Sequence, residues 1–243
     1  NQDAENVGYE FDAYNQVTVT VSSQAYVFVK TTDKITVSAL SNGGIKVNWN
    51  LVTGASNYRI YRRTINPDGT RSGWTYLGQV SGSTKTYTDT KGLESDTNYE
   101  YTVRTYTAKG LSAVCRFANL HYYGVPKVTA KSATGGVKVS WNKIDGAKQY
   151  VVYRKYSGAS SWSIIKTVSA STLSYLDAKA TSGKTIYYTV RAVGAEGRSN
   201  YKQVSLAYIG VPHVTSVTNT NSGIQVKWNS VANSSGYRVY RKA

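Results

Sequence analysis

The hexapeptide Gly44-Ile45-Lys46-Val47-Asn48-Trp49 recurs twice further along the chain and decides the fold class. Its later versions read Gly136-Val137-Lys138-Val139-Ser140-Trp141 and Gly223-Ile224-Gln225-Val226-Lys227-Trp228. In each version, aliphatic residues alternate with polar ones up to the tryptophan. Because successive side chains of a strand point to opposite faces, this period of two predicts a strand that buries one face and ends on a core tryptophan.

Two further repeated segments extend the strand pattern. Tyr58–Arg63 matches Tyr150–Lys155 and Tyr237–Lys242, and Tyr101–Arg104 matches Tyr188–Arg191. Turn-forming residues separate these runs, as in the stretches around residues 42–44, 67–69 and 134–136. About seven short strands in about 90 residues are typical of a two-sheet sandwich. We therefore predict an all-β protein built of elongated, tandem antiparallel β-sandwiches.

The composition excludes several classes of protein. The 243 residues include 22 Tyr but only two His, one Cys and no Met. So few histidines and cysteines exclude most metal sites built from them, and a single cysteine excludes a disulfide within the chain. No apolar run approaches the length of about 18 residues that a membrane-spanning helix needs.

Each copy of the repeat resembles a fibronectin type III domain. The resemblance lies in the tryptophan of the second strand, the Tyr-x-aliphatic third strand and the tyrosine-rich sixth strand, and it covers roughly residues 34–243. Leu93 followed by Thr97–Tyr101 resembles the tyrosine corner of that family, with Tyr99 as the corner residue, whereas the second copy has Ile186 there. The Trp-Asn, Gly-Ala and Tyr-Arg-Lys pairings are similar to modules of secreted and surface proteins of Gram-positive bacteria. The resemblance implies fibronectin type III or immunoglobulin-like sandwiches in an extracellular protein.

The repeats divide the chain into two full and two partial domains. Tight joints at Gly124-Val125-Pro126 and Gly210-Val211-Pro212 close the full copies, and their prolines restrict bending. We expect full domains at 34–124 and 125–211, the last strands of a preceding sandwich at 1–33, and the first three strands of a further one at 212–243. A different, immunoglobulin-like preceding domain is the alternative for residues 1–33.

The two partial ends carry opposite charge. Residues 1–33 hold five acids and one Lys, whereas residues 212–243 hold four Lys or Arg and no acid. One hypothesis is that the two ends pair head to tail between molecules and complete one sandwich. The other is that they are arbitrary cut points in a longer chain, which flanking domains continue.

The remainder of the chain is strongly basic. Residues 34–243 hold 28 Lys or Arg and eight acids, a net charge of +20. Such a field attracts polyanions, for example acidic polysaccharides or anionic cell-wall polymers, with affinity that falls as salt is added. We expect no specific nucleic-acid partner, because the chain has no zinc-finger spacing, basic helix or RNP-like pattern.

The outward positions of the third and sixth strands form a candidate contact surface for glycans or polyanions. We expect Glu100, Thr102 and Thr189 to be exposed there beside tyrosines and cations, with a tryptophan of the next strand close by. Flat aromatic rings beside cationic donors suit acidic sugars, but the same ladder also stabilises a sheet by itself. The candidate residues are Tyr61, Arg63, Trp74 and Arg104 in the first copy and Tyr153, Lys155, Trp162, Tyr187 and Arg191 in the second.

No catalytic or cofactor constellation is readable. His121 and His213 flank the joints, which favours a packing role. Asp89, Glu94 and Asp96 are expected in a solvated turn, without the spacing of a calcium loop. Gly194–Gly197 is expected to be a hairpin turn with no phosphate-loop pattern, and Cys115 a small buried residue of a late strand. We expect no enzyme, no metal and no cofactor.

Three functions remain as hypotheses. The first is a non-catalytic extracellular spacer or stalk that displays or links other modules. The second is adhesion through carbohydrate or anionic wall polymer. The third is an assembly subunit joined through its partial ends.

Overall fold

The computed structural model describes residues 7–11, 17–21, 29–114 and 116–242, and none of them is helical. Cys115 lies outside the described residues. The first two described segments form an antiparallel hairpin of β1 (Val7–Phe11) and β2 (Val17–Val21). No helix of the described residues is long and apolar enough to cross a bilayer.

The first full sandwich consists of two antiparallel sheets. One has the strand order β3-β4-β7, and the other has the order β10-β8-β5-β6 with the short β9 also paired to β8. The strands are β3 (Ile35–Ala39), β4 (Ile45–Trp49), β5 (Asn57–Ile65), β6 (Thr75–Ser81), β7 (Thr86–Asp89), β8 (Thr97–Thr107), β9 (Gly110–Leu111) and β10 (Ala118–Tyr122).

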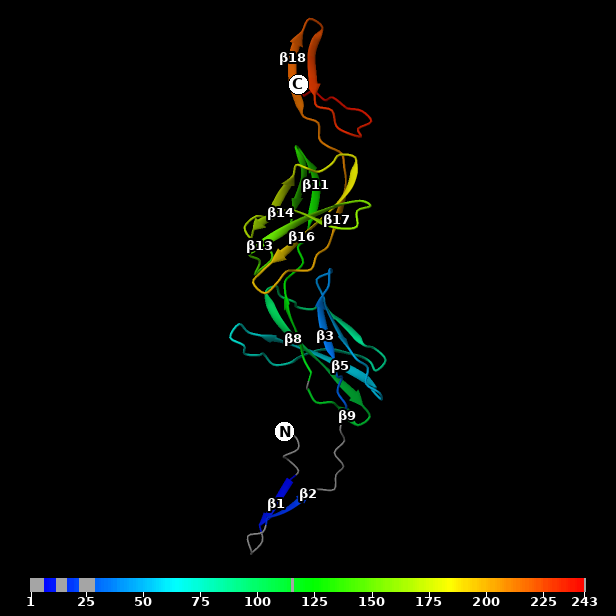
Figure 1. Cartoon of the computed structure of the whole chain (residues 1–243), viewed down its shortest axis with the longest axis vertical. Coiled ribbons are helices and arrows are strands. Elements are labelled where there is room, and N and C mark those ends of the chain that lie inside the picture. Colours follow the sequence, from blue (N-terminus) through cyan, green and yellow to red (C-terminus); the bar gives the residue numbers. More distant parts are fainter. Residues whose placement is uncertain (1–6, 12–16, 22–28, 115, 243) are drawn as a thin grey trace.

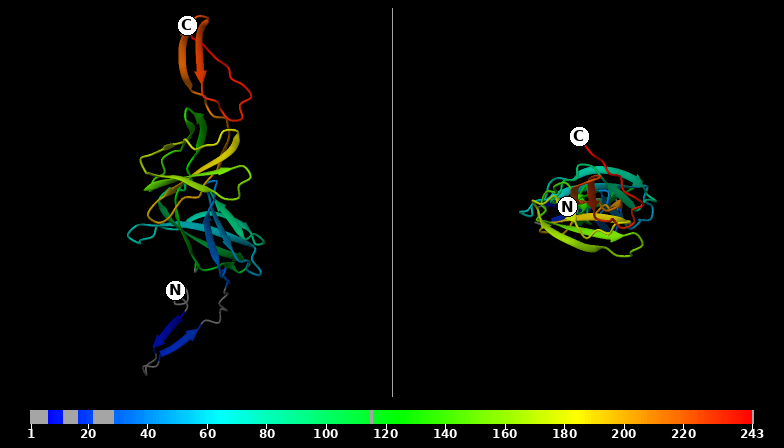
Figure 2. Two further views of the ribbon diagram at one scale, coloured as in Figure 1. Left: turned by 45° about the horizontal axis from the view of Figure 1, so that its top comes forward. Right: turned by 90° about the horizontal axis from the view of Figure 1, so that it is seen from above.

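The second full sandwich repeats this topology. Its sheets have the orders β11-β12-β15 and β14-β13-β16-β17. Figures 1 and 2 show the two sandwiches stacked end to end along the long axis of the molecule. The prediction of tandem antiparallel sandwiches is confirmed. The strands are β11 (Thr129–Ala133), β12 (Gly136–Ser140), β13 (Gln149–Tyr156), β14 (Ser163–Ser169), β15 (Ser174–Asp177), β16 (Lys184–Val193) and β17 (Val204–Tyr208).

A tryptophan–tyrosine pair anchors the core of each copy. Trp49 is 4% exposed and its ring centre lies 5.4 Å from that of fully buried Tyr58. The Tyr58 hydroxyl accepts a hydrogen bond from the backbone N–H of Val52 at 2.6 Å, which fixes the loop between β4 and β5. Trp141 and Tyr150 repeat the arrangement in the second sandwich, where the bonded N–H belongs to Ile144.

A buried carboxylate connects the two sheets of each sandwich. Asp89, at the end of β7, accepts hydrogen bonds from Arg62 on β5 and from the Tyr101 hydroxyl on β8. It is 1% exposed, so the expectation of a solvated Asp89 was wrong: the strand continues to this residue and turns its side chain inward. In the second sandwich, Asp177 binds Arg154 and Tyr188 in the same way.

The tyrosine corner takes two forms. In the first sandwich, the Tyr99 hydroxyl accepts a hydrogen bond from the Glu94 N–H at 2.8 Å, as the resemblance implied. In the second sandwich, Tyr156 takes over: its hydroxyl accepts a bond from the Thr181 N–H at 3.1 Å. Tyr156 is the cross-strand partner of Ile186. The corner hydrogen bond has therefore moved to the facing strand rather than disappeared.

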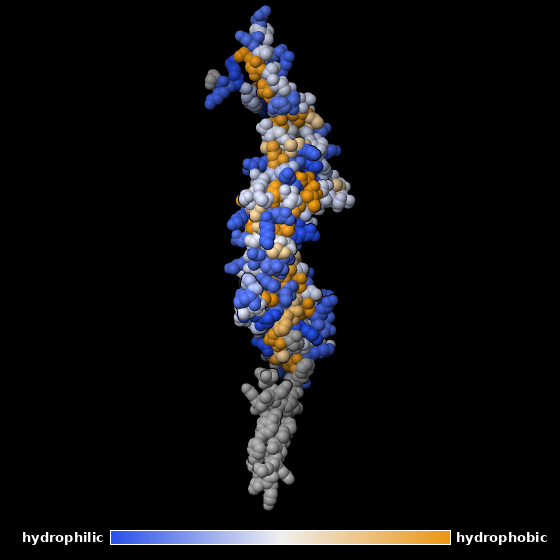
Figure 3. Space-filling model, turned by 60° about the vertical axis from the view of Figure 1, so that its left-hand side comes forward, coloured by the Kyte–Doolittle hydropathy of each residue, from blue (hydrophilic) through white to orange (hydrophobic). Residues whose placement is uncertain are grey.

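The third copy forms only one hairpin, β18 (Val214–Thr220) with β19 (Gly223–Trp228). The third strand expected at Tyr237–Lys242 is not formed, because the described chain supplies no neighbouring strand for it. Tyr237 still keeps its local contacts, since its hydroxyl accepts a bond from the Val231 N–H. Apolar side chains near this end lie on the surface (Figure 3), among them Ile224 and Tyr240.

Replacing Tyr156 with Phe tests the transferred corner. The change removes one hydroxyl and leaves the Thr181 N–H without its acceptor, so we expect the free energy of unfolding of the second sandwich to fall by about 1 kcal/mol. Urea denaturation measures it. Tyr187→Phe is the control, because the Tyr187 hydroxyl makes no hydrogen bond among those of the described residues. An equal loss in both variants would contradict the assignment.

Burial, together with the neighbouring carboxylate, raises the pKa of Tyr188 far above that of an ordinary phenol. Below about pH 10 the phenol is protonated in both the folded and the unfolded chain, so its contribution to stability is complete. Above that pH only the unfolded chain ionises, and stability falls. We expect Tyr188→Phe to make this alkaline fall shallower by about 1.4 kcal/mol per pH unit. Denaturation at a series of pH values measures the slope, and an unchanged slope would refute the expectation.

Candidate functional site

The outer face of the first sandwich centres on a buried carboxylate. Glu100, on β8, lies directly opposite Arg63 of β5 and is 2% exposed. Its Oε2 accepts a hydrogen bond from Arg63 Nε at 2.6 Å and lies 3.5 Å from Arg71 Nε. The expectation of an exposed Glu100 was wrong, because two arginines cover it. The face thus neutralises part of its own charge.

Aromatic rings cover Arg63 in turn. Its guanidinium carbon lies 4.2 Å from the centre of the Trp74 ring and 5.3 Å from that of Phe117. The two rings are nearly parallel, with centres 5.7 Å apart. Tyr61 packs on Tyr76, which is half exposed, at 5.5 Å. Of the predicted residues, Arg63 and Trp74 are brought together, with Phe117 and Arg71 as members that the alternation pattern did not reveal, and Tyr61 forms a separate pair with Tyr76.

An irregular segment after β9 covers the middle of this face. Thr102 is buried because its hydroxyl donates to the Arg116 carbonyl, and Arg104 Nε donates to the Ser112 carbonyl at 2.6 Å. In the second sandwich Thr189 is buried in the same way, donating to the Lys202 carbonyl. The exposure predicted for both threonines was wrong, since strand alternation does not show what a loop covers.

The outer face of the second sandwich joins cations and rings without a carboxylate. Lys155 Nζ lies 5.3 Å from the centre of the Trp162 ring and 5.7 Å from that of Tyr187. Trp162 meets Tyr201 edge to face at 6.0 Å, and the Arg191 guanidinium lies 5.4 Å from the Tyr201 ring. Arg191 Nε also donates to the Ser199 carbonyl. Four of the five predicted residues are thus brought together, with Tyr201 added. The fifth, Tyr153, is half-buried on β13, next to Thr189 of β16.

The first joint is fixed by hydrogen bonds between the two sandwiches. Ser95 Oγ donates to the Asp145 carbonyl at 2.8 Å and accepts from the Gly124 N–H at 3.0 Å. Asn200 Nδ2 donates to the Ala39 carbonyl at 2.8 Å. These bonds connect loops of both sandwiches on either side of the linker.

Tyr123 fills the centre of the first joint. It is 2% exposed, and its hydroxyl accepts a hydrogen bond from the Glu196 N–H at 3.2 Å. A Cβ atom on Gly194 would lie 2.2 Å from that hydroxyl, so only glycine fits there. His121 packs on the Tyr123 ring and its Nε2 lies 3.0 Å from Asp96 Oδ1. The hairpin expected at Gly194–Gly197 is present and serves the joint.

The second joint repeats the serine hydrogen bonds of the first. Ser182 Oγ donates to the Ala232 carbonyl at 2.7 Å and accepts from the Gly210 N–H at 3.0 Å. Asn233 Nδ2 adds a bond to the Ser182 carbonyl. His213, expected to pack here, donates its backbone N–H to Asn229 Oδ1.

Each joint brings together two residues of left-handed backbone, one of them glycine. At the first joint Asp96 (φ 60°) faces Gly146 (φ 75°); at the second, Gly183 (φ 76°) faces Asn233 (φ 62°). A Cβ on Gly146 would come within 2.1 Å of Asp96, and one on Gly183 within 2.0 Å of Asn233. Asp and Asn tolerate this conformation better than other side chains. Each joint therefore has room for a single side chain, which the preceding copy supplies at the first joint and the following copy at the second.

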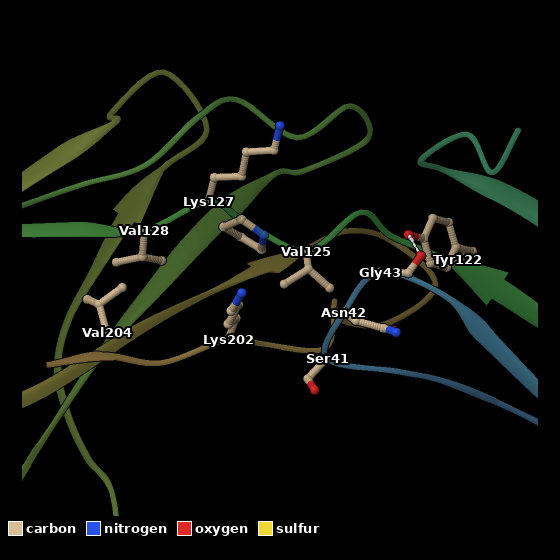
Figure 4. A pocket seen from close by; sticks show the side chains of 10 residues that line it. Ser41, Asn42, Gly43, Tyr122, Val125, Lys127, Val128, Lys202 and Val204 are labelled. Carbon is tan, nitrogen blue, oxygen red and sulfur yellow. Dashed lines mark hydrogen bonds between the residues drawn. The ribbon is translucent and has the colours of Figure 1, made fainter. Parts of the chain in front are cut away.

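A cleft of about 530 Å³ opens beside the first joint (Figure 4). Tyr122 donates its hydroxyl to the Gly43 carbonyl at 2.5 Å at one end of it. Lys127 and Lys202 are exposed at the other end of the cleft. The remaining lining residues are Ser41, Asn42, Val125, Pro126, Val128 and Val204. None of the lining residues carries a carboxylate.

Within the described residues, no group of three His, Cys, Asp or Glu side chains is placed to hold a metal ion. The three acids of the expected solvated turn are separated: Asp89 is in the core, Asp96 pairs with His121, and Glu94 is exposed.

Comparison with known proteins gives matches among solved structures alone. No family model and no curated protein matches the sequence. The chain is similar to a two-domain fibronectin type III segment of chicken tenascin, with 16% identity over 73% of this chain and 99% of that one and a TM-score of 0.36. It is also similar to the FN1–FN3 domains of chicken contactin (CNTN1), with 15% identity over 79% and 68% and a TM-score of 0.33. Strand order and register define the antiparallel sandwich fold of both full copies.

Replacing Glu100 with Gln tests the buried ion pair. The change leaves two arginines without their carboxylate, so we expect the first sandwich to lose about 3 kcal/mol of unfolding free energy. Glu94→Gln, at an exposed position, is expected to change it by less than about 0.5 kcal/mol. Chemical denaturation measures both. A loss below about 1 kcal/mol for Glu100→Gln would show that the pair contributes no more than a surface salt bridge.

Proposed function

We propose that the chain is a rigid spacer in a secreted or cell-surface protein, holding the parts on either side of it at a set distance. The observation that carries this proposal is that one joint geometry occurs twice in succession. At both joints a serine hydroxyl links the linker glycine to a loop of the following copy. Such a repeated set of hydrogen bonds restricts the motion of neighbouring copies relative to each other.

The first joint supports a fixed orientation most strongly. Tyr123 is enclosed between the two sandwiches, and Asn200 adds a hydrogen bond away from the linker. Relative motion of the sandwiches would expose the tyrosine ring and break these bonds together. A surface or secreted setting follows from the resemblance in the sequence and is part of the proposal.

The rigidity of the first joint is tested by residual dipolar couplings of the whole chain in a weakly aligning medium. We expect the couplings of both sandwiches to fit one alignment tensor. In Gly194→Ala, the added Cβ displaces the Tyr123 hydroxyl, and two tensors of different magnitude are expected. Gly73→Ala is the matched control, because nothing lies within 4 Å of a Cβ there. Two tensors in the unaltered chain would overturn the spacer proposal.

A further inference from the structure

The outer face of the second sandwich is basic and lacks any internal counter-charge. Residues 125–211 contain 13 Lys or Arg and three acids. Each acid lies elsewhere: Asp177 is enclosed between the sheets, Asp145 belongs to the joint loop, and Glu196 to the hairpin that touches Tyr123. Neither Lys155 nor Arg191 forms an ion pair within the described part of the chain.

One pair of opposed positions distinguishes this face from its counterpart. In the first sandwich Arg63 stands opposite Glu100, and in the second Lys155 stands opposite Tyr187. The two faces otherwise share their strand order, their tryptophan at the start of the outer strand and their arginine bound to a loop carbonyl. The second face thus has Lys155 and Arg191 at the positions of Arg63 and Arg104, but Tyr187 where the first has the carboxylate of Glu100.

The cations of the second face are also crowded. Burial, and then the charge of nearby Arg198, lower the pKa of the Arg191 guanidinium. A charge that is partly withdrawn from water and repelled by another cation gains from a bound anion. An anion bound beside Arg191 would reduce its repulsion with Arg198.

We propose that the outer face of the second sandwich, centred on Lys155, Tyr187 and Arg191, is a binding site for an acidic polysaccharide. Carboxylate or sulfate groups of the polymer would bind the ammonium and guanidinium groups. Its hydroxyls would form hydrogen bonds with the phenolic hydroxyls of Tyr187 and Tyr201. This inference is independent of the spacer proposal, since a stiff stalk and a flexible one both present this face.

A polysaccharide fits this face better than a nucleic acid does. Lys155 already lies over the Trp162 and Tyr187 rings, and Arg191 lies over Tyr201. Single-stranded nucleic acids bind chiefly by stacking bases on open aromatic rings. Here the cations occupy ring faces, and the groups offered to a partner are charged and phenolic donors. Such donors match the carboxylates and hydroxyls of an acidic sugar chain.

The test is titration of the full chain with polygalacturonate oligomers of defined length, followed by calorimetry. We expect Lys155→Gln with Arg191→Gln to weaken binding about tenfold, since two charge-assisted contacts are lost. The matched control is Lys131→Gln with Lys138→Gln, which removes the same charge from the opposite sheet, where the two lysines are cross-strand partners. It is expected to change the affinity by less than about twofold, because distant charges are screened.

A second variant introduces into the second face the carboxylate that the first face has. Tyr187→Glu places a carboxylate opposite Lys155, as Glu100 stands opposite Arg63, and is expected to weaken binding at least as much as the double substitution. A circular dichroism melt establishes that each variant is folded. The proposal is overturned by equal losses in the two double variants, by undiminished binding in Tyr187→Glu, or by no binding of the unaltered chain. Binding of oligothymidylate that is as tight and equally sensitive to these changes would overturn the choice of partner class.

Discussion

An aspartate enclosed between the two sheets is the interaction on which each sandwich depends. Asp89 and Asp177 lie at the ends of β7 and β15, in the three-stranded sheets, and each accepts hydrogen bonds from an arginine and a tyrosine hydroxyl of the facing sheet. Removing a charge from water is costly, so the group is satisfied only when all its partners are in place. Packing of the apolar core and these directional bonds both fix how one sheet lies on the other. We infer that the carboxylate selects a single stagger.

The strand pattern was readable from the sequence because burial on one face of a strand leaves a period of two. The repeats at Trp49 and Trp141 therefore located the core strands, and the sidedness of Tyr61, Arg63 and Lys155 was correct. Alternation along a strand shows which face a side chain lies on, but it does not show whether other parts of the chain cover that side chain. Glu100 and Thr102 point away from the core, as expected. They are nevertheless buried, because two arginines cover Glu100 and a loop covers Thr102.

The sequence pattern also does not show when a residue on one strand takes over the role of a residue on another. Ile186 occupies the position of the corner tyrosine in the second copy, and the chain supplies the hydroxyl from Tyr156 across the strand pair instead. Only the register of β13 with β16 shows that these two positions are neighbours. In the same way, Tyr237–Lys242 has the sequence of a strand, yet backbone pairing requires a partner that the described third copy does not provide. A strand is a property of a pair of segments, which one segment cannot specify.

The joints add a constraint on the order of the domains. The first joint takes its single side chain from the preceding sandwich, as Asp96, and the second takes it from the following one, as Asn233. Were the exit loop of the first sandwich joined to the entrance loop of the third copy, Asp96 and Asn233 would compete for a space that holds one of them. The copies therefore share a fold without being interchangeable. Their outer faces lie away from this constraint, so the exchange of Glu100 for Tyr187 leaves stacking undisturbed. Each copy can thus change the chemistry it presents to its surroundings while the contacts at the joints stay the same.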